Sequence, residues 1–428
     1  LDAGFSSWGN TFTTGDIIQI AFDADSGKLW FGKNNTWEVS GDPAAGTNPA
    51  ATLTSNIWTP GWAQISTSAS NAVINYGQDS SFAGAVTAQG NQDGNGKGDF
   101  YYEPPTDYLA LCSDNLPSPS IADPSAHFNT ITWTGDATSP RSFTGVGFTP
   151  DLIWAKNRTT GVSHMLYDTV RGAGSTKSLV SDANLAEGGG NQATYGYLSA
   201  FDSDGFTTTD GSGSPNYYFN ENTKNFVAWN WKAGGASTVT NTDGDEESEV
   251  SANTNAGMSV VTWTNHNVTV GHGLSQAPEL IIIKDRSATA SWLVYSEPVG
   301  NAHTLFLNGT NAKDSGTTYF NSTSPNSSVF SVGTGIGGST DNYLAYCFHG
   351  VDGYSKVGSA TGSSGNLFVY MGFKPAFIMW KATNSAQNWN IYDSKRPEYN
   401  QSYHLLEPNT TDIESTDWTT NRVDIVSN

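Results

Sequence analysis

The motif that decides the fold occurs three times: GFTPDLIWAK at residues 147–156, GLSQAPELIIIK at residues 273–284 and GFKPAFIMWK at residues 372–381. In each copy the proline precedes the closing lysine by six residues (156−150, 284−278, 381−375). A tyrosine follows each lysine by eleven residues, at Tyr167, Tyr295 and Tyr392. Equal spacings in three separate segments indicate an internal repeat.

Each copy of the motif predicts a β-strand that is covered on both faces. Proline is tolerated at the first position of a strand, where its missing N–H is least needed. The apolar run that follows, such as Leu280–Ile283, does not alternate with polar residues, which is typical of a fully buried strand. The next strand brings the tyrosine back across a hairpin, through Trp292–Tyr295 in the second copy and Trp389–Tyr392 in the third.

Aromatic strands are expected on both sides of the motif. They are predicted before it at Ile131–Thr134, Val261–Thr264 and Phe368–Tyr370, and after it, as closing strands, at Phe226–Trp231 and Tyr343–Phe348. The closing strand lies 73 residues after the lysine in the first copy (229−156) and 62 in the second (346−284). In the third copy it would fall between 443 (381+62) and 454 (381+73), beyond Asn428. We therefore expect the third copy to be truncated, its closing strand supplied by a continuation of the chain rather than by another chain.

Three β-sandwich domains follow from this spacing. We name them repeat 1 (residues 118–235), repeat 2 (251–355) and repeat 3 (356–428). Joints are expected at Ser118–Ser120, along the polar run Ala233–Asn255 and near Gly350–Ser355. The middle joint contains the acidic stretch Asp243–Glu247, and its composition predicts a solvated linker.

The segment before the repeats, residues 1–117, predicts another sandwich. Gly15–Asp23 and Lys28–Lys33 read as two strands joined by a tight Asp-Ser-Gly turn. These residues, with Asn75–Gly77 and the tail from Phe100 to Pro117, resemble the SPRY domain. The resemblance implies a bent β-sandwich that binds proteins and sometimes glycans. The first strands of that family would precede Gly15, so the domain is expected to be cut at its N-terminus.

Composition agrees with an all-β chain of serial β-sandwich domains. Of the 428 residues, 36% are hydrophobic, 14% are charged and 46 are glycine, a mixture typical of short strands joined by many turns. No stretch approaches the roughly 18 apolar residues of a membrane-spanning helix. Cys112 and Cys347 lie far apart and are predicted to be buried free thiols.

The charge balance bears on partners. The chain carries 40 acidic and 19 basic residues, a formal net charge of −21. An acidic surface repels phosphate backbones and anionic lipids, so neither nucleic acid nor a membrane is expected as a partner.

The tandem pattern is similar to an uncharacterised repeat domain frequent in virion proteins of marine tailed phages, where it often follows a SPRY-like domain. Together with the SPRY resemblance, it covers nearly all of the chain. It implies a non-catalytic virion structural protein, such as a tail fibre or other surface appendage, with an adhesive, receptor-contacting or spacer role. Expected partners are other virion proteins and a host surface glycan or protein. Because fibres are commonly symmetric, a homotrimer is the expected assembly.

Motifs that carry chemistry are sparse. Residues 333–338 match G-x-G-x-x-G, but a strand rather than a helix is expected next, so we interpret them as a glycine-rich turn and predict no cofactor. The seven histidines show no ligand spacing for zinc, and we predict no metal site. Asp243, Asp245 and Glu247 could gather around Ca²⁺, but they lack the full ligand series of such a loop. No catalytic residues are predicted.

Three tryptophans are the candidate binding residues. Trp8, Trp37 and Trp58 lie near turns of the SPRY-like segment, where flat rings can stack on a sugar or anchor a protein partner, although packing in the core is the other interpretation. Two alternatives to an adhesive appendage stay open. One is a secreted carbohydrate-binding protein or glycan hydrolase, and the other is a purely architectural element without affinity for a host surface.

Overall fold

The computed structural model describes residues 9–53, 72–115, 119–213, 215–362, 367–417 and 423–426. These residues form antiparallel sheets with very few helical turns, so the predicted all-β class is confirmed. The chain divides between Ser118 and Pro119 into two units. No helix in the described part of the chain has the length and apolar content needed to cross a membrane.

The first unit is built on the predicted hairpin. β1 (Ile18–Asp23) and β2 (Lys28–Lys33) pair antiparallel with Asp23 opposite Lys28. The sheet is completed by β3 (Thr36–Trp37) and β4 (Ala51–Thr52), which both pair with β2, and the short helices η1 (Glu38–Ser40) and η2 (Ser113–Asn115) lie outside it. Trp30 of β2 is 1% exposed, and its indole N–H donates to the carbonyl of Thr47.

Repeat 1 is a sandwich of two sheets. The larger has the order β5-β12-β7-β8-β9 and the smaller the order β10-β11-β6. Their bounds are β5 (Phe128–Thr134), β6 (Arg141–Phe143), β7 (Leu152–Asn157), β8 (Met165–Asp168), β9 (Leu179–Val180), β10 (Tyr197–Asp202), β11 (Gly205–Thr209) and β12 (Asn225–Trp231), with η3 (Pro124–Ala126) and α1 (Gln192–Tyr195) between them. The motif strand β7 lies between β12 and β8, as its uninterrupted apolar run predicts.

Repeat 2 has the same plan with a longer main sheet. The main sheet has the order β13-β14-β15-β22-β17-β18-β19-β20, and β16 and β21 form the small sheet. The bounds are β13 (Val239–Asn241), β14 (Ser248–Asn253), β15 (Met258–Thr264), β16 (Val268–Gly271), β17 (Leu280–Asp285), β18 (Leu293–Ser296), β19 (His303–Phe306), β20 (Asp314–Ser315), α2 (Thr317–Phe320), β21 (Val329–Val332), η4 (Thr334–Ile336) and β22 (Asn342–Phe348).

The prediction of a solvated linker at Ala233–Asn255 is wrong. That segment forms the hairpin β13–β14, which extends the main sheet of repeat 2 through the pairing of β14 with β15. Val250 is 4% exposed because it faces the repeat 2 core, and this apolar contact outweighs the polar composition of its neighbours. Only the acidic turn between β13 and β14 is solvated as the composition predicted, since Asp243, Asp245 and Glu247 are exposed.

Repeat 3 contributes the hairpin of β23 (Phe377–Lys381) and β24 (Trp389–Asp393). The strand predicted at Phe368–Tyr370 is absent, and these residues are exposed coil. In repeats 1 and 2 the corresponding strands β5 and β15 are held by the closing strands β12 and β22. No third closing strand is present among the described residues, so Phe368–Tyr370 has no strand to pair with.

The three motif hairpins share one register. Ile153 lies opposite Tyr167, Ile281 opposite Tyr295, and Ile378 opposite Tyr392, so each tyrosine meets the residue three positions after the motif proline (153−150, 281−278, 378−375). The hairpins predicted from the Pro-to-Lys and Lys-to-Tyr spacings are therefore confirmed.

The two faces of the motif strands β7 and β17 enter different cores. In β7, Ile153 and Ala155 join a core within repeat 1, beneath its small sheet. Leu152 and Trp154, which alternate with them, join a second core that all three repeats share. β17 divides its side chains in the same way, between a core within repeat 2 and the shared core.

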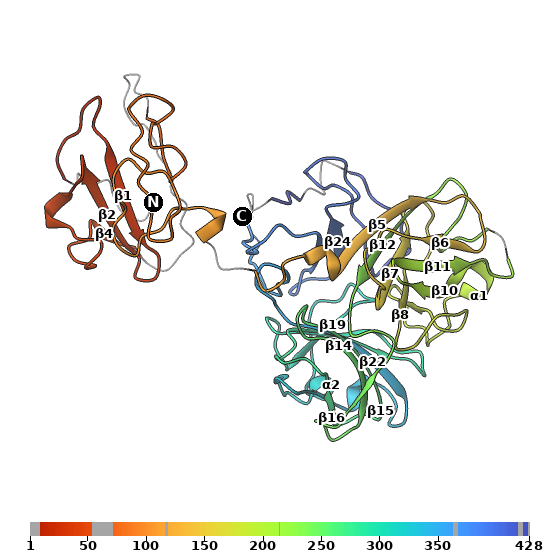
Figure 1. The fold of residues 1–428 in the computed structure, drawn as a ribbon. Helices are drawn as coiled ribbons and strands as arrows, with labels where there is room; N and C mark the ends of the chain where they lie inside the picture. The colour runs from red at the N-terminus through yellow and green to blue at the C-terminus, as the bar shows by residue number, and fades with distance from the viewer. Residues whose placement is uncertain are drawn as a thin grey trace. The chain divides into compact units, whose positions relative to one another are not determined.

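The repeats close into a ring around the shared core. The Glu187 N–H donates to the carbonyl of Arg286 (3.0 Å), the Lys313 N–H to that of Thr383 (2.8 Å), and the Glu414 N–H to that of Arg158 (2.8 Å). Each acceptor stands two residues after its motif lysine (286−284, 383−381, 158−156). Repeat 1 thus contacts repeat 2, repeat 2 contacts repeat 3, and repeat 3 returns to repeat 1 (Figure 1).

Candidate functional site

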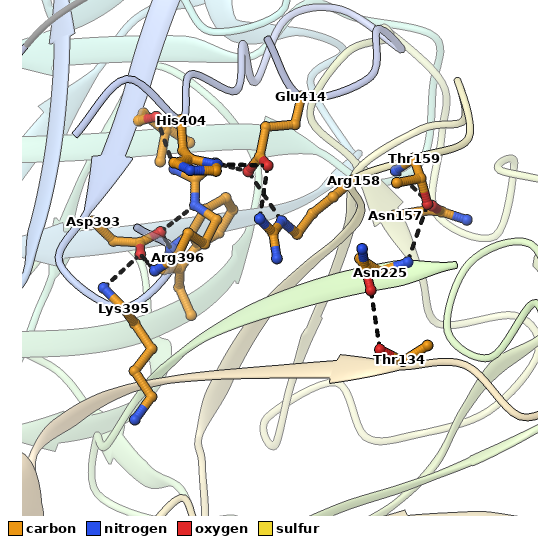
Figure 2. A network of polar contacts seen from close by, with 12 residues as sticks. Thr134, Asn157, Arg158, Thr159, Asn225, Asp393, Lys395, Arg396, His404 and Glu414 are labelled. Carbon is orange, nitrogen blue, oxygen red and sulfur yellow. Dashed lines mark hydrogen bonds and ion pairs between the residues drawn. The ribbon is translucent and has the colours of Figure 1, made fainter. Parts of the chain in front are cut away.

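A buried network of charged side chains joins repeat 3 to repeat 1 (Figure 2). Arg158 follows the motif strand β7, and its guanidinium donates to both carboxylate oxygens of Glu414, through Nε (3.0 Å) and Nη2 (2.7 Å). Arg396 donates from Nη1 to Oε1 of the same carboxylate at 2.8 Å, and His404 places Nδ1 2.9 Å from Oε2. Glu414 therefore accepts from three side chains, two of them permanently charged.

The surroundings of Glu414 fix its charge. Burial alone would raise the pKa of this carboxyl, but hydrogen bonds from His404 and Arg158 and the charge of Arg396 outweigh burial and lower its pKa to about 2. An ionised carboxylate only accepts hydrogen bonds, so Nδ1 of His404 carries the proton between them. A carboxyl with this pKa is a poor proton donor near neutral pH, and Glu414 therefore acts as an anchor for two arginines.

The second carboxylate of the network belongs to Asp393, at the end of β24. Its Oδ2 accepts from Nε of Arg396 (2.5 Å) and from the indole N–H of Trp229 in β12 (2.9 Å). The Arg396 guanidinium lies 5.5 Å from the centre of the Trp229 ring, within the range of a cation–π contact. The side chains of Asp393 and Arg396 are 0% exposed. The closing strand of repeat 1 is thus bonded directly to repeat 3.

The same arrangement recurs between repeat 2 and repeat 1. Arg171 donates from Nε to Asp168 (2.6 Å) and from Nη1 to Glu187 (3.2 Å). Arg286 of repeat 2 donates to Glu187 (2.7 Å), and the Tyr346 hydroxyl of the closing strand β22 donates to Asp168 (2.8 Å). Burial and the neighbouring Asp168 raise the pKa of the Tyr346 hydroxyl, which keeps it protonated as a donor.

The interface between repeats 3 and 2 is built differently. Where the other two interfaces have a Glu–Arg pair, this one has Lys313 and Thr383, joined through their backbones. The positions that correspond to Asp168 and Arg171, one and four residues after the tyrosine, hold Ser296 and Val299. The indole of Trp389 donates to the carbonyl of Phe306 at 2.8 Å. Nζ of Lys381 also donates across this interface to the carbonyl of Thr310 at 3.0 Å. Backbone, indole and lysine hydrogen bonds and apolar contact therefore hold this interface.

The motif lysines bind backbone carbonyls. Nζ of Lys156 donates to Val162 (2.5 Å) and, across the ring, to Thr411 of repeat 3 (3.1 Å), and Nζ of Lys284 donates to Ala290 (2.7 Å). Burial disfavours the charged ammonium and lowers the pKa of both lysines to about 8. Each lysine lies next to the last residue of its strand and satisfies a carbonyl of the following turn, which explains its place in the motif.

Of the predicted binding residues, only Trp37 lies within the described residues. It ends β3 and is half-buried beside Gly32 of β2. Trp8 and Trp58 lie outside the described residues. A shallow hollow occurs elsewhere, lined by Gln401, Tyr403, His404 and Thr416. It adjoins the Glu414 network through His404, whose ring stacks on Tyr403 at a centroid distance of 4.8 Å.

The other motifs serve structure. Residues 333–338 form η4 and lead into β22, so the interpretation as a glycine-rich turn is confirmed. In the acidic turn, Asp245 accepts from the Thr269 hydroxyl and Glu246 from the Asn265 amide. Within the described ranges, no group of three or more His, Cys, Asp or Glu side chains could hold a metal ion. Cys347 is a buried free thiol as predicted, whereas Cys112 is only half-buried because it lies in a surface turn.

Sequence reasoning missed the charged network, although a signal was present. The pattern Asp-x-x-Arg follows the repeat tyrosine directly in two copies, at 168–171 and at 393–396, and an arginine stands two residues after the lysine in the first two copies. The matching acidic residues, Glu187 and Glu414, have no such fixed spacing from a motif. The ring contacts were needed to bring them together.

Comparison with known proteins places most of the chain in one family. A family model described as "Domain of unknown function (DUF7483)" matches residues 123–428. No curated protein and no solved structure matches the chain.

Proposed function

The chain belongs to the DUF7483 family, and on that premise we propose that it is a non-catalytic structural protein of a phage-like particle, with an adhesive or spacer role on a tail fibre or similar surface appendage. The SPRY-like segment would contact the host surface or a neighbouring virion protein. The repeats would form the body that carries it.

The observation that carries this proposal is that the buried carboxylates bind donors of neighbouring repeats. Arginines of a neighbouring repeat donate to Glu414 and Glu187. The Trp229 indole and the Tyr346 hydroxyl donate across the ring to Asp393 and Asp168. Groups that are desolvated and paired in this way rigidify a body and have no free position for a substrate atom. A rigid body with an acidic surface suits a part that must hold its shape in salty water.

An antibody raised against the chain tests the location. Intact phage particles from a host that produces this protein would be labelled with the antibody and imaged by electron microscopy. We expect label at a tail or surface appendage. Particles that remain unlabelled, while the same antibody recognises the chain in the infected lysate, would overturn the virion assignment.

A glycan array tests the adhesive role and the absence of catalysis together. The chain would be applied to immobilised glycans, and both retention and release of reducing sugar would be measured. Retention without release agrees with an adhesin, and neither retention nor release agrees with a spacer. Release of reducing sugar would contradict the non-catalytic proposal and favour a glycan hydrolase.

A further inference from the structure

Among the described residues, the motif strand of repeat 3 is paired along one edge only. β7 lies between β8 and β12, and β17 lies between β18 and β22. β23 pairs with β24 alone among the described residues. Within the described part of the chain, β23 therefore lacks the partner that the closing strand supplies in the two other repeats.

The backbone groups at this edge can be identified from the complete repeats. The Arg158 N–H donates to Asn225 and the Arg286 N–H to Asn342, both at 2.8 Å, so these residues point toward the closing strand. In an antiparallel pair every second residue points the same way. Counting by twos from the equivalent Thr383, the N–H and C=O groups of Lys381, Met379 and Phe377 face the free edge of β23.

Exposed apolar side chains occur on β23 and in the segment before it. Trp380 is 47% exposed, whereas Ile283, which also precedes the motif lysine, is 1% exposed. In the segment before β23, Leu367, Phe368, Val369 and Tyr370 are exposed by 51%, 63%, 46% and 44%. Exposed large apolar groups together with unpaired strand backbone are the pattern of a strand-binding surface.

We propose that this edge binds one extended polypeptide strand with the side-chain pattern of β12 and β22, supplied from outside the described residues. The strand would run antiparallel to β23, between β23 and residues 367–370. The repeat 3 sheet would then have the order seen in repeat 1, where β12 lies between β5 and β7. The inference is independent of the proposed role on a virion.

The complete repeats also specify the side chains of this strand. In β12 the residues opposite Lys156, Trp154 and Leu152 are Val227, Trp229 and Trp231, and β22 has Leu344, Tyr346 and Phe348 at those positions. These side chains face or adjoin the shared core. The bound strand therefore needs three large apolar residues at alternate positions, opposite Lys381, Met379 and Phe377.

Two further positions of the bound strand can be specified, the residue opposite Trp380 and the central residue that would contact repeat 2. The residue opposite Trp380 corresponds to Ala228 and Ala345, so a small side chain is expected there. The central aromatic ring, which bonds to Asp393 in repeat 1 and to Asp168 in repeat 2, would meet Ser296 and Val299 in repeat 3. Phenylalanine should therefore serve at this position as well as tyrosine or tryptophan.

A peptide with the sequence KNFVAWNWK, residues 224–232 of repeat 1, tests the proposal on the intact chain. The labelled peptide would be titrated with the chain and followed by fluorescence anisotropy. We expect saturable binding, at least tenfold weaker binding for a shuffled peptide, and at least tenfold weaker binding when the amides of Val227 and Trp229, which face the motif strand, are N-methylated. Equal binding of all three peptides would overturn the proposal.

A variant of the chain provides the reciprocal test. Met379→Pro removes an N–H from the free edge, where proline is tolerated best, and should abolish peptide binding. Near-ultraviolet circular dichroism checks that the variant folds. If it does not fold, the N-methylated peptides still test whether the peptide binds through its backbone.

Light scattering without peptide tests whether a second copy of the chain occupies the edge instead. A stable dimer that Met379→Pro dissociates would assign the edge to a second copy of the chain and overturn the proposal.

Discussion

Repeats 2 and 3 carry the same motif, yet their motif strands lie in different surroundings. β17 and β23 both begin two residues after the proline and pair with their tyrosine strand in the same register. In β17, Ile281 and Ile283 are 0% and 1% exposed. In β23, Ile378 is half-buried and Trp380 is 47% exposed.

The comparison separates two levels of structure. The motif itself is enough to form a strand and its hairpin, because these depend on local pairing and on the proline and lysine at its ends. Burial of the strand depends on what its neighbours supply, namely a closing strand and a small sheet. Repeat 3 keeps its place through the shared core and through the charged network with repeat 1, in which Arg158 pairs with Glu414.

The largest expected effect comes from the network that holds repeat 3. Arg396→Met would remove the charged partner of Asp393 and the fully buried partner of Glu414. We expect the free energy of unfolding to fall by about 3–5 kcal/mol. Lys313→Met is the matched control, because Lys313 of repeat 2 makes the backbone contact that Glu414 makes in repeat 3, but its side chain is exposed. This variant should lower the free energy of unfolding by under about 0.5 kcal/mol. Urea unfolding measures both, and equal losses would contradict the contrast between the two interfaces.

Truncation of the same residue type in the two motif strands comes next. Ile281→Ala should lower the free energy of unfolding by about 2–4 kcal/mol, because it leaves a cavity in the repeat 2 core. Ile378→Ala removes a side chain that solvent already reaches, and we expect a loss of under about 1 kcal/mol. Thermal and urea unfolding of both variants measure the two losses in the free energy of unfolding. A loss for Ile378→Ala as large as that for Ile281→Ala would show that the β23 face is covered in solution.

Acid should weaken the repeat 3 network selectively. The pKa of Glu414 is lowered from 4.5 to about 2 in the folded chain, so its contribution is present above about pH 4.5 and is lost as the pH falls toward 2. The shift corresponds to at most about 3 kcal/mol. Acidification from about pH 6 to about pH 2.5 should therefore lower the free energy of unfolding less in Glu414→Gln than in the unaltered chain, as measured by urea unfolding at both pH values. An identical pH dependence in the variant would refute this role.

The smallest effect is expected at the most exposed motif position. Trp380→Thr should change the free energy of unfolding by no more than about 0.5 kcal/mol, whereas Ile283→Thr at the equivalent position should cost about 1–3 kcal/mol because it buries a hydroxyl in an apolar core. Urea unfolding of the two variants makes the comparison. A large loss for Trp380→Thr would indicate that a strand already covers this edge.

Much of the fold could be predicted from short-range pattern. The motif strands, their hairpins and the closing strands follow from the positions of proline, lysine and tyrosine, since strand pairing over a short turn depends on local sequence. Two predictions were wrong, the strand at Phe368–Tyr370 and the linker at Ala233–Asn255, and both depended on contacts with distant parts of the chain. A strand needs a partner, and the presence or absence of that partner overrode composition in both segments.

The ring and its charged network could not be predicted in the same way. Glu414 lies 256 residues from Arg158, and no pattern in the sequence relates the two. The repeated Asp-x-x-Arg pattern could have indicated a shared structural role for Asp168 and Asp393. It could not have named Tyr346 and Trp229 as their partners, because these contacts cross between repeats.

Closure of the ring has a consequence for how the repeats unfold. In a linear array the terminal units touch one neighbour and fray before the middle of the array melts. Here each repeat touches two others, so none can detach without breaking two interfaces at once. Residues 119–428 should therefore lose hydrogen-exchange protection in one cooperative step, with no graded melting from either end.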